Sequence, residues 1–236
     1  MAAPAVRPFL VIPVKPPAGS KQRLSVRLAD EARELVSRSL AIRAVGAAVA
    51  AWPQGRLLVV TADPILVEFC QRFGVATVSD PGVGQSAAVR AGAEWCLERG
   101  ANVLATVAAD LPSVTAPDLV LVLRLSKSIP MGAMVLFPDL GGTGTNGLVV
   151  RPASLQLHSF GPDSRRRHQA LATSLGLQFR LVEVPGLAWD VDRPEDLELP
   201  AVSTATPHPV ISWAHGMAAV AGVRTDSLGS PSSDGI

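Results

Sequence analysis

The chain has 236 residues, enough for one large α/β domain or for a domain with a tail, and a hydrophobic fraction of 48% allows a complete core. Its 21 Lys and Arg against 20 Asp and Glu give a net charge of +1, so the overall field favours neither nucleic acid nor an anionic membrane. The apolar run at residues 9–14 is shorter than a signal-peptide core, and no apolar stretch is long enough to span a bilayer, which indicates a soluble, cytoplasmic protein.

Short apolar runs alternate with amphipathic segments through the first half of the chain. We expect buried strands at residues 9–14, 56–61, 76–78 and 103–108. Apolar residues at i, i+3 and i+4 spacing predict helices at residues 29–49, 65–73 and 86–99. Cys70 and Cys96 fall within these helices, match no zinc or redox spacing and are expected to serve packing. The alternation implies right-handed crossovers and a mainly parallel sheet.

The pattern changes after Lys127. Residues 131–137, 147–150 and 178–184 are typical of strands, and residues 160–175 of a loop that leads into a helix. Pro194 suits the first turn of a final helix. Beyond about residue 200 the composition shifts to Ser, Thr, Pro and Gly. We therefore expect one domain at residues 1–200 and a partly disordered C-terminal extension at residues 201–236.

Ligands of a parallel α/β sheet bind beyond the carboxyl ends of its strands, and that rule places four loops on one rim. They are residues 15–24, 61–64, 80–86 and 110–112. In the first loop, Lys15, Lys21 and Arg23 can converge on a polyanion, and the backbone near Gly19 and Ser20 can add donors. The loop lacks the spacing of a Walker A motif, and a solvated loop with incidental charges stays an alternative.

Three carboxylates form the second candidate feature. Asp110 directly follows a buried strand, where a carboxylate is unfavourable unless a cation or hydrogen-bond donors meet it. Asp190 and Asp192 are two residues apart in an extended segment, which directs both side chains to the same side. Magnesium takes one or two carboxylates together with phosphate oxygens, so this set favours a metal–triphosphate site. Helix capping by each group is the alternative.

A glycine-rich segment at residues 141–146 and a Phe-Gly-Pro-Asp-Ser segment at residues 160–164 form the third feature. Glycines let an anion approach the backbone, while Thr145 and Ser164 offer hydroxyl donors. Ser164 is placed to open a helix, whose N-terminus favours a phosphate or a carboxylate. The charged run at residues 165–168 can enter the site in part or form a solvated face. A tight turn followed by an ordinary helix cap is the alternative.

Six motifs follow one another along the chain from about Phe9 to about Leu199. They are Val-Lys-Pro…Lys-Gln-Arg-Leu, Val-Val-Thr-Ala-Asp-Pro, Ala-Asp-Leu-Pro, Gly-Thr-Gly-Thr-Asn, Phe-Gly-Pro-Asp-Ser-x-x-x-His and Asp-Val-Asp-x-Pro-Glu-Asp-Leu. Together they resemble the phosphoenolpyruvate or 2-phospho-L-lactate guanylyltransferases of coenzyme F420 biosynthesis, which are related to the molybdenum-cofactor nucleotidyltransferases. The glycine motif followed by Phe-Gly-Pro-Asp-Ser is the most specific part of the resemblance.

The resemblance implies a fold, a reaction and a set of site residues. The implied fold is a single Rossmann-like nucleotidyltransferase domain with a mainly parallel central sheet, of the nucleotide-diphospho-sugar transferase type. GTP and phosphoenolpyruvate would give enolpyruvoyl-2-diphospho-5'-guanosine and diphosphate. The implied magnesium ligands are Asp110, Asp190 and Asp192, and the implied contacts of the phosphoacid are Thr145, Gly161 and Ser164. The implied catalytic residues are Lys15 and Asp110, and the implied nucleotide contacts are Lys15, Lys21, Arg23, Gln85 and Ser86.

Several alternatives stay open at this point. The family usually has Leu-Asn near the base, where this chain has Gln85-Ser86. The acid could be 2-phospho-L-lactate or 3-phosphoglycerate instead of phosphoenolpyruvate, and the acceptor could be a sugar phosphate or molybdopterin. A non-catalytic nucleotide-binding module is the alternative from another class. The implied partner is the transferase that takes the product to the F420 precursor, and the sequence is also compatible with a homodimer.

Overall fold

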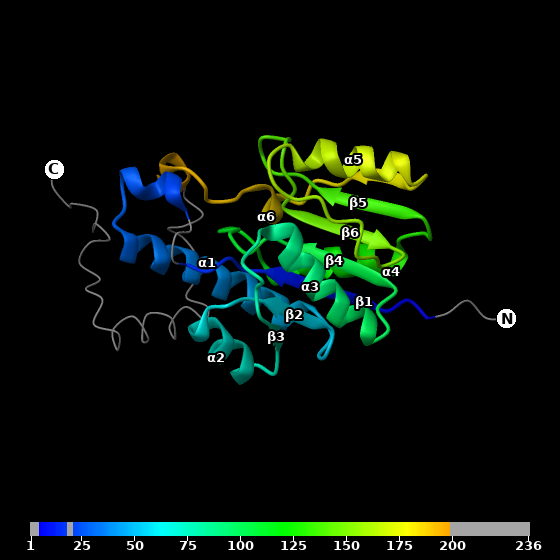
Figure 1. The fold of residues 1–236 in the computed structure, drawn as a ribbon, viewed down its shortest axis with the longest axis horizontal. Coiled ribbons are helices and arrows are strands. Elements are labelled where there is room, and N and C mark those ends of the chain that lie inside the picture. The colour runs from blue at the N-terminus through cyan, green and yellow to red at the C-terminus, as the bar shows by residue number, and fades with distance from the viewer. Residues whose placement is uncertain (1–4, 18–20, 199–236) are drawn as a thin grey trace, which may run out of the picture.

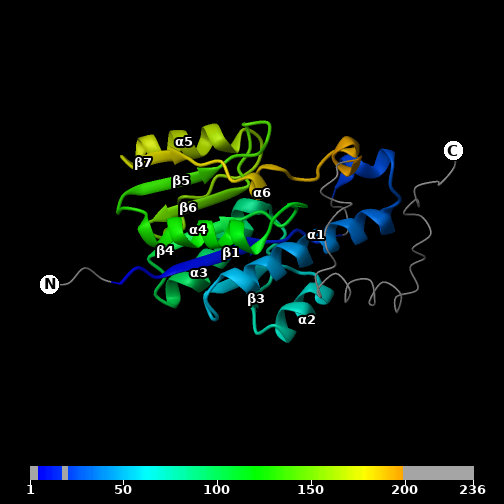
Figure 2. The same ribbon diagram turned by 180° about the vertical axis from the view of Figure 1, so that it is seen from behind.

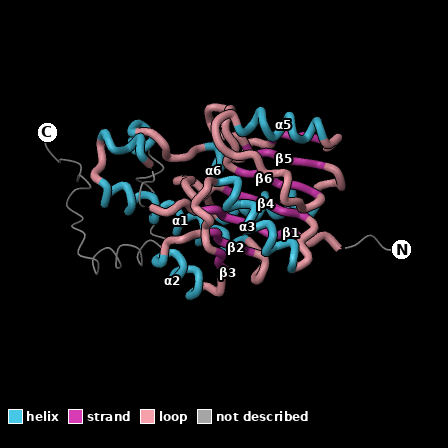
Figure 3. The backbone as a smooth tube through the Cα atoms, viewed as in Figure 1, coloured by secondary structure: helices cyan, strands magenta, loops and turns pink. Residues whose placement is uncertain are grey.

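The computed structural model describes residues 5–17 and 21–198. The strands are β1 (Pro8–Pro13), β2 (Leu57–Val60), β3 (Ala76–Val78), β4 (Val103–Val107), β5 (Ala133–Phe137), β6 (Gly147–Arg151) and β7 (Gln178–Leu181). The α-helices are α1 (Asp30–Ala51), α2 (Pro64–Arg72), α3 (Gln85–Glu98), α4 (Ala116–Ser128), α5 (Ser164–Ser174) and α6 (Pro185–Ala188). Two short 3-10 helices are η1 (Gln22–Val26) and η2 (Pro194–Glu198). Figure 3 shows the helices flanking one group of neighbouring strands.

The strands form one sheet in the order β3-β2-β1-β4-β6-β5-β7. Every pairing among these described strands is parallel except the two that β6 makes, with β4 and with β5. The sheet is therefore mainly parallel, as the sequence predicts. All residues of β1, β2 and β4 are buried, which agrees with their uninterrupted apolar sequences.

Helices cover both faces of the sheet, and the two faces have separate cores. On one face, apolar residues of α1, α2 and α4 pack against Leu10 and Val59 of the sheet. On the other face, α3 and α5 pack against Val11 and Leu58. Figures 1 and 2 show these two layers from opposite sides. The result is a three-layer α/β/α domain, which leaves the ends of the strands as the open rim of the sheet.

The first half of α1 extends beyond the sheet and carries a small cluster of its own (Figures 1 and 2). Leu40 of α1 packs there with Leu24 of η1 and with Val191, which precedes η2. Helix η1 therefore lies against α1, and η2 in turn contacts η1. This contact brings the basic loop after β1 next to the segment that contains Asp190 and Asp192.

Most of the expected elements are present, but helices α4, α6 and η1 were not expected, and two other elements differ from expectation. Helix α4 has no counterpart among the expected elements, because its Leu-Val-Leu-Val-Leu sequence at residues 119–123 lacks a helical period. Strand β7 ends at Leu181 rather than at residue 184, and the final helix is the short η2. Cys70 and Cys96 are buried, as expected, and burial raises the pKa of each thiol to about 12.

Two further expectations concern the ends of the chain and the membrane. The expected extension at residues 201–236 lies outside the described residues. Within the described residues, no helix combines the length and the apolar character that crossing a bilayer requires.

Candidate active site

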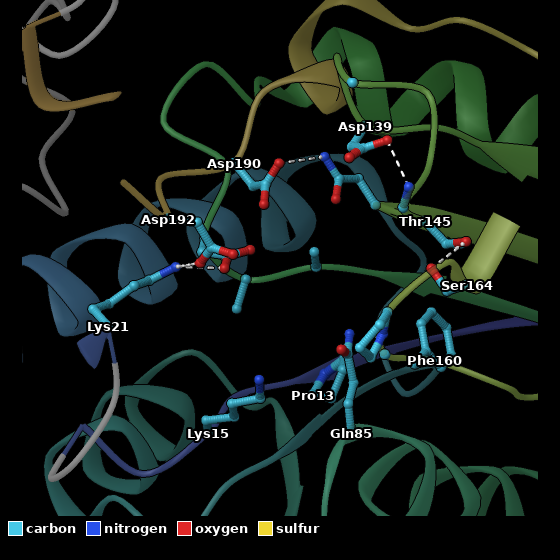
Figure 4. A pocket seen from close by; sticks show the side chains of 18 of the residues that line it. Pro13, Lys15, Lys21, Gln85, Asp139, Thr145, Phe160, Ser164, Asp190 and Asp192 are labelled. Atoms are coloured by element: carbon cyan, nitrogen blue, oxygen red, sulfur yellow. Dashed lines mark hydrogen bonds and ion pairs between the residues drawn. The ribbon is translucent and has the colours of Figure 1, made fainter. Parts of the chain in front are cut away.

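A cavity of about 920 Å³ opens at the rim of the sheet, beyond the carboxyl end of β1 (Figure 4). Its volume lies in the range of small-molecule sites. Ten of the predicted site residues line it: Lys15, Lys21, Arg23, Gln85, Asp110, Thr145, Gly161, Ser164, Asp190 and Asp192. The predicted site residues therefore meet in one cavity, from segments that lie up to 177 residues apart (15 to 192).

The order of the strands explains why these distant segments meet. The chain moves from β1 to β2 on one side and later returns to β4 on the other side of β1. Such a switch point leaves a crevice at the carboxyl ends, where Lys15 follows β1 and Asp110 follows β4. Because β6 is antiparallel, the residues before it, Thr145 and Asn146, reach the same rim. There the N–H of Ala108 donates to the carbonyl of Asn146 over 2.8 Å.

Three carboxylates gather at this rim. One oxygen from each of Asp110, Asp190 and Asp192 lies within 4.8 Å of the others, and all three residues are half-buried. The backbone N–H of Val191 donates to the carbonyl of Asp110 over 3.1 Å, which joins the two segments. Val191 is fully buried while its two neighbours line the cavity, as the two-residue spacing predicts.

Helix capping does not account for these carboxylates. Helix α4, which follows Asp110, is capped by Thr115 in a capping box with Asp118. Before η2, the carboxylate of Asp196 accepts the backbone N–H of Asp192 over 2.8 Å. Thr115 therefore caps α4, so Asp110 does not, and the carboxylates of Asp110 and Asp192 meet Lys21 instead.

The surroundings of Asp190 shift its pKa. Burial, followed by the charge of Asp110, raises the pKa of Asp190 to about 6, against the opposing effects of Asn146 and Lys21. Asn146 donates from Nδ2 to Asp190 Oδ1 over 3.3 Å and to the carbonyl of Leu187 over 2.9 Å. Burial and the charge of Asp110 both disfavour the ionised form of Asp190, and a nearby cation would stabilise that form. Three oxygen donors this close could hold a metal ion.

Lys21 supplies positive charge to the same cluster (Figure 4). Its Nζ donates to Asp110 Oδ2 over 2.6 Å and to Asp192 Oδ1 over 3.2 Å, and its side chain is 7% exposed. Burial lowers the pKa of Lys21, but the two carboxylates outweigh burial and leave the pKa above its ordinary value. The ammonium therefore stays charged at neutral pH, in contact with two carboxylates at the wall of the cavity.

Lys15 and Arg23 remain closer to solvent than Lys21. Lys15 is exposed and lines the cavity (Figure 4). Arg23 has a 70% exposed side chain, and its Nη1 lies 3.8 Å from Asp192 Oδ2. Both cations are free to meet an anionic ligand, because neither is enclosed by protein.

The two residues at the start of α3 differ in position. Gln85 lines the cavity (Figure 4), whereas Ser86 is absent from its wall among the described residues. The Oγ of Ser86 instead accepts the backbone N–H of Phe160 over 2.9 Å. Ser86 therefore holds the loop that carries Gly161.

The glycine-rich loop is organised by a carboxylate of its own. Oδ1 of Asp139 accepts the N–H of Thr143 over 2.8 Å and that of Gly144 over 2.7 Å. These two amides are therefore engaged within the loop, so the backbone contact with an anion expected here does not come from them. Arg165 donates from Nη1 to the carbonyl of Gly142 over 2.9 Å and fixes the loop to α5.

The predicted phosphoacid contacts form one hydrogen-bonded group. The Oγ of Ser164, the first residue of α5, lies 3.0 Å from Oγ1 of Thr145. Gly161 has φ +117°, and a Cβ there would lie 2.7 Å from Nη2 of Arg167, so this position requires glycine. Arg167 in turn donates to the carbonyl of Phe160 over 2.9 Å. Arg165 and Arg167 therefore hold loops of the site together. The two expected roles of the charged run, entry into the site and a solvated face, do not include this structural role.

Three residues of the site carry no predicted role. They are Asp139, Asn146 and His168, which position the glycine loop, Asp190 and Thr145 respectively. Asn146 and His168 belong to the motifs of the resemblance, so the sequence marks their positions. Their partners lie 44 and 23 residues away, and only the folded chain reveals them.

The sequence matches one family of known proteins. The family model described as "Guanylyl transferase CofC like" matches residues 9–200. A phosphoenolpyruvate guanylyltransferase from Sphaerobacter thermophilus is 38% identical over 188 residues, which cover 80% of this chain and 89% of the relative. One from Rubrobacter xylanophilus is 36% identical over 189 residues, which cover 80% and 91%. A 3-phospho-D-glycerate guanylyltransferase from Colwellia psychrerythraea is 28% identical over 197 residues, which cover 84% and 92%.

Solved structures share the fold at much lower identity. A protein from Desulfovibrio desulfuricans G20, assigned to the nucleotide-diphospho-sugar transferases, matches with a TM-score of 0.62 and 14% identity, over 91% of this chain and 96% of its own. A 4-diphosphocytidyl-2C-methyl-D-erythritol synthase matches with a TM-score of 0.55 and 13% identity, over 85% and 99%. The expected nucleotide-diphospho-sugar transferase fold is confirmed, and at these identities the likeness speaks for the fold alone.

Proposed function

The chain belongs to the family of CofC-like guanylyl transferases, and from this premise we propose that it transfers the guanylyl group of GTP to phosphoenolpyruvate. The products would be enolpyruvoyl-2-diphospho-5'-guanosine and diphosphate, in the biosynthesis of coenzyme F420. The observation that carries the proposal is that the three carboxylates and the Thr145–Ser164 pair line one cavity. Relatives named for phosphoenolpyruvate, at 38% and 36% identity, support the choice of acid.

We assign the carboxylates to a magnesium ion. Asp110, Asp190 and Asp192 offer oxygen donors within 4.8 Å of one another, and carboxylate oxygens are the donors that Mg²⁺ prefers. When bound, the ion would neutralise charge on the reacting phosphates and so reduce their mutual repulsion. The raised pKa of Asp190 supports this assignment, because a bound cation would offset both the burial of this carboxylate and the neighbouring charge of Asp110.

The phosphoacid is assigned to the far side of the cavity from Lys21. Thr145 and Ser164 present hydroxyls there, next to Gly161, which also lines the cavity. Lys15, Lys21 and Arg23 are assigned to the phosphates of GTP, and Gln85 to the region of the base. Ser86 acts in this account through the Phe160 loop rather than by direct contact with the nucleotide.

The reaction needs no protein nucleophile. An oxygen of the acid's phosphate attacks the α-phosphorus of GTP, a new P–O bond forms, and the bond from the α-phosphorus to the bridging oxygen breaks. The electron pair leaves with diphosphate, and no proton transfer is required for balance. The protein contributes by aligning the two substrates and by offsetting charge, which are the terms that dominate phosphoryl-type transfers.

Diphosphate release from GTP tests the proposal. With Mg²⁺ present, we expect release that depends on phosphoenolpyruvate and that is slower with 2-phospho-L-lactate and with 3-phospho-D-glycerate. Asp110→Asn should reduce turnover by about 100-fold or more, because it removes a metal-facing carboxylate oxygen. Glu98→Gln, at a 74% exposed position at the end of α3, is the matched control and should keep wild-type turnover.

The acid assay also decides among the remaining alternatives. Preference for 3-phospho-D-glycerate would mean that the acceptor is the acid named for the Colwellia relative. The proposal of guanylyl transfer would then stand with a different acid. GTP binding without diphosphate release with any of the acids would favour a non-catalytic nucleotide-binding module. Near-normal turnover in Asp110→Asn would remove the metal assignment.

A further inference from the structure

His168 is a buried histidine whose two ring nitrogens have different kinds of partner. It lies one turn after Ser164 on α5 and is 0% exposed. Its Nε2 lies 2.9 Å from the backbone N of Ser159, and its Nδ1 lies 3.2 Å from Oγ1 of Thr145. The ring also meets Phe160 edge-on, with 4.9 Å between centroids. The site assigned to the phosphoacid therefore rests directly on this imidazole.

The backbone of Ser159 decides which nitrogen carries the hydrogen. An amide N–H can only donate, so Nε2 has to accept and therefore carries no hydrogen. Burial, partly opposed by the nearby carbonyl of Ser164, lowers the pKa of His168 to about 4, so the ring is neutral at neutral pH. A neutral ring without hydrogen on Nε2 carries it on Nδ1. His168 therefore presents an N–H donor to Thr145 Oγ1.

Counting hydrogens then gives a direction to the hydroxyl pair. Thr145 and Ser164 together have two hydroxyl hydrogens, and the 3.0 Å contact between their oxygens uses one of them. Since Nδ1 is a donor, it cannot accept the second hydrogen. That hydrogen is left for the cavity, which both residues line. With the hydrogen on Nε2 instead, Nδ1 would accept from Thr145, and no hydroxyl hydrogen would remain.

Only outward-pointing donors are useful to an anionic ligand. The carboxylate and the phosphate oxygens of a phosphorylated acid act as acceptors at neutral pH. We propose that His168 is a positioning residue that, through its fixed Nδ1–H form, makes the Thr145–Ser164 pair donate a hydrogen bond to the phosphoacid. The identity of that ligand rests on the function proposed above, whereas the direction of the hydrogen bonds rests on the contacts of His168.

The ring form of His168 is measurable without any activity. ¹⁵N spectra of histidine-labelled wild-type protein distinguish a hydrogen on Nδ1 from one on Nε2, and His168→Asn identifies the signal by its loss. We expect the neutral Nδ1–H form at neutral pH, although free imidazole side chains in water favour Nε2–H. A signal of the Nε2–H form, or of a charged ring, would overturn the proposal.

A double-mutant cycle tests the effect on the acid. His168→Phe keeps a ring against Phe160 but removes the donor, and we expect it to raise the KM of the acid roughly tenfold while the KM of GTP stays unchanged. His168→Asn restores an N–H near the position of Nδ1 and should recover part of that loss. In a Thr145→Val background, His168→Phe should have no further effect on the KM of the acid.

The outcomes separate this proposal from a structural role and from failure of the proposed function. A structural role predicts equal losses for GTP and acid, in proportion to lost stability, and the same loss in the Thr145→Val background. Either result contradicts the positioning role. If no acid supports diphosphate release, the proposed function fails, while the ¹⁵N spectrum of the wild-type protein still decides the direction of the hydrogen bonds.

Discussion

At the scale of single residues, the site holds three carboxylates that repel one another and that nearby cationic and amide groups stabilise. Asp110 and Asp192 share the ammonium of Lys21, while Asp190 has the amide of Asn146. Of the three predicted phosphate-binding cations, Lys21 is the least exposed. Its side chain is 7% exposed, that of Arg23 is 70% exposed, and Lys15 is also exposed. Lys21 therefore competes for the same oxygens that would bind a metal ion.

Replacing Lys21 should change how the protein responds to a divalent cation. In Lys21→Met the carboxylates lose their internal cation, so without metal we expect a loss of roughly 1–3 kcal/mol of unfolding free energy. Mg²⁺ no longer has to displace an ammonium, so the rise in Tm on adding Mg²⁺ should be larger than in the wild type. Thermal melts with and without Mg²⁺ measure both effects.

Arg23→Met is the matched control for Lys21→Met. Its guanidinium lies 3.8 Å from Asp192 on an exposed side chain, so its contribution to stability is small. We expect its Mg²⁺-dependent rise in Tm to stay close to that of the wild type. An equal rise in both variants and the wild type would contradict competition between Lys21 and the metal.

Residue patterns predict the carboxylates well and their partners poorly. The two-residue spacing of Asp190 and Asp192, and the place of Asp110 after a buried strand, follow from local geometry. The contacts of Lys21 with two of these carboxylates do not, because they depend on where η1 meets α1 and η2. Long-range packing of this kind leaves no periodic signal in the sequence.

At the scale of elements, the direction of β6 assembles the side of the cavity that we propose for the phosphoacid. A parallel strand would place the residues before it at the opposite edge of the sheet. Because β6 pairs antiparallel with β4, Thr145 lies at the rim beside Asp110. The sequence predicts the strand itself but not its direction, which depends on the pairing partner rather than on the apolar run.

Helix α3 comes unusually close to the sheet at one glycine. A Cβ at Gly92 would lie 2.6 Å from Val11 and 2.9 Å from Val60, at branched side chains of two buried strands. Gly92→Ala should therefore lower the unfolding free energy by about 1–3 kcal/mol through overpacking, despite the better helix propensity of alanine. Denaturant unfolding measures the change.

Arg90→Ala on the same helix is the control for Gly92→Ala. Arg90 is exposed, so we expect a change within about 0.5 kcal/mol. A Gly92→Ala variant as stable as this control would mean that α3 can move away from the sheet at no cost. Gln85, at the start of α3, ties the position of this helix to the cavity wall.

Helix α4 shows where periodicity fails as a guide. Its alternating Leu and Val residues fit a strand as well as a helix, and the helix is set by the capping box of Thr115 and Asp118 and by burial of Leu119 and Val122. The sequence indicates where this helix begins, through Thr115 and Asp118, more clearly than it indicates that residues 119–123 are helical. Tertiary packing decides the rest.

At the scale of the whole molecule, the alternation of strands and helices is enough to predict the three-layer fold and the rim on which the ligands bind. The family model matches residues 9–200, nearly the same span that the motifs cover. The expected single domain at residues 1–200 agrees with that match but stays a prediction, as does the role of residues 201–236. What the whole sequence does not specify is which phosphoacid binds, since these acids differ by a few atoms.

The most direct test of guanylyl transfer follows the oxygen atoms of the acid. The protein is incubated with GTP, Mg²⁺ and phosphoenolpyruvate that carries ¹⁸O in the three terminal oxygens of its phosphate. The masses of both products are then measured by mass spectrometry. Attack by the acid on the α-phosphorus predicts that all three labels remain in the guanylylated acid and that the released diphosphate carries none. Label in the diphosphate, or diphosphate released without a guanylylated acid, would contradict the account.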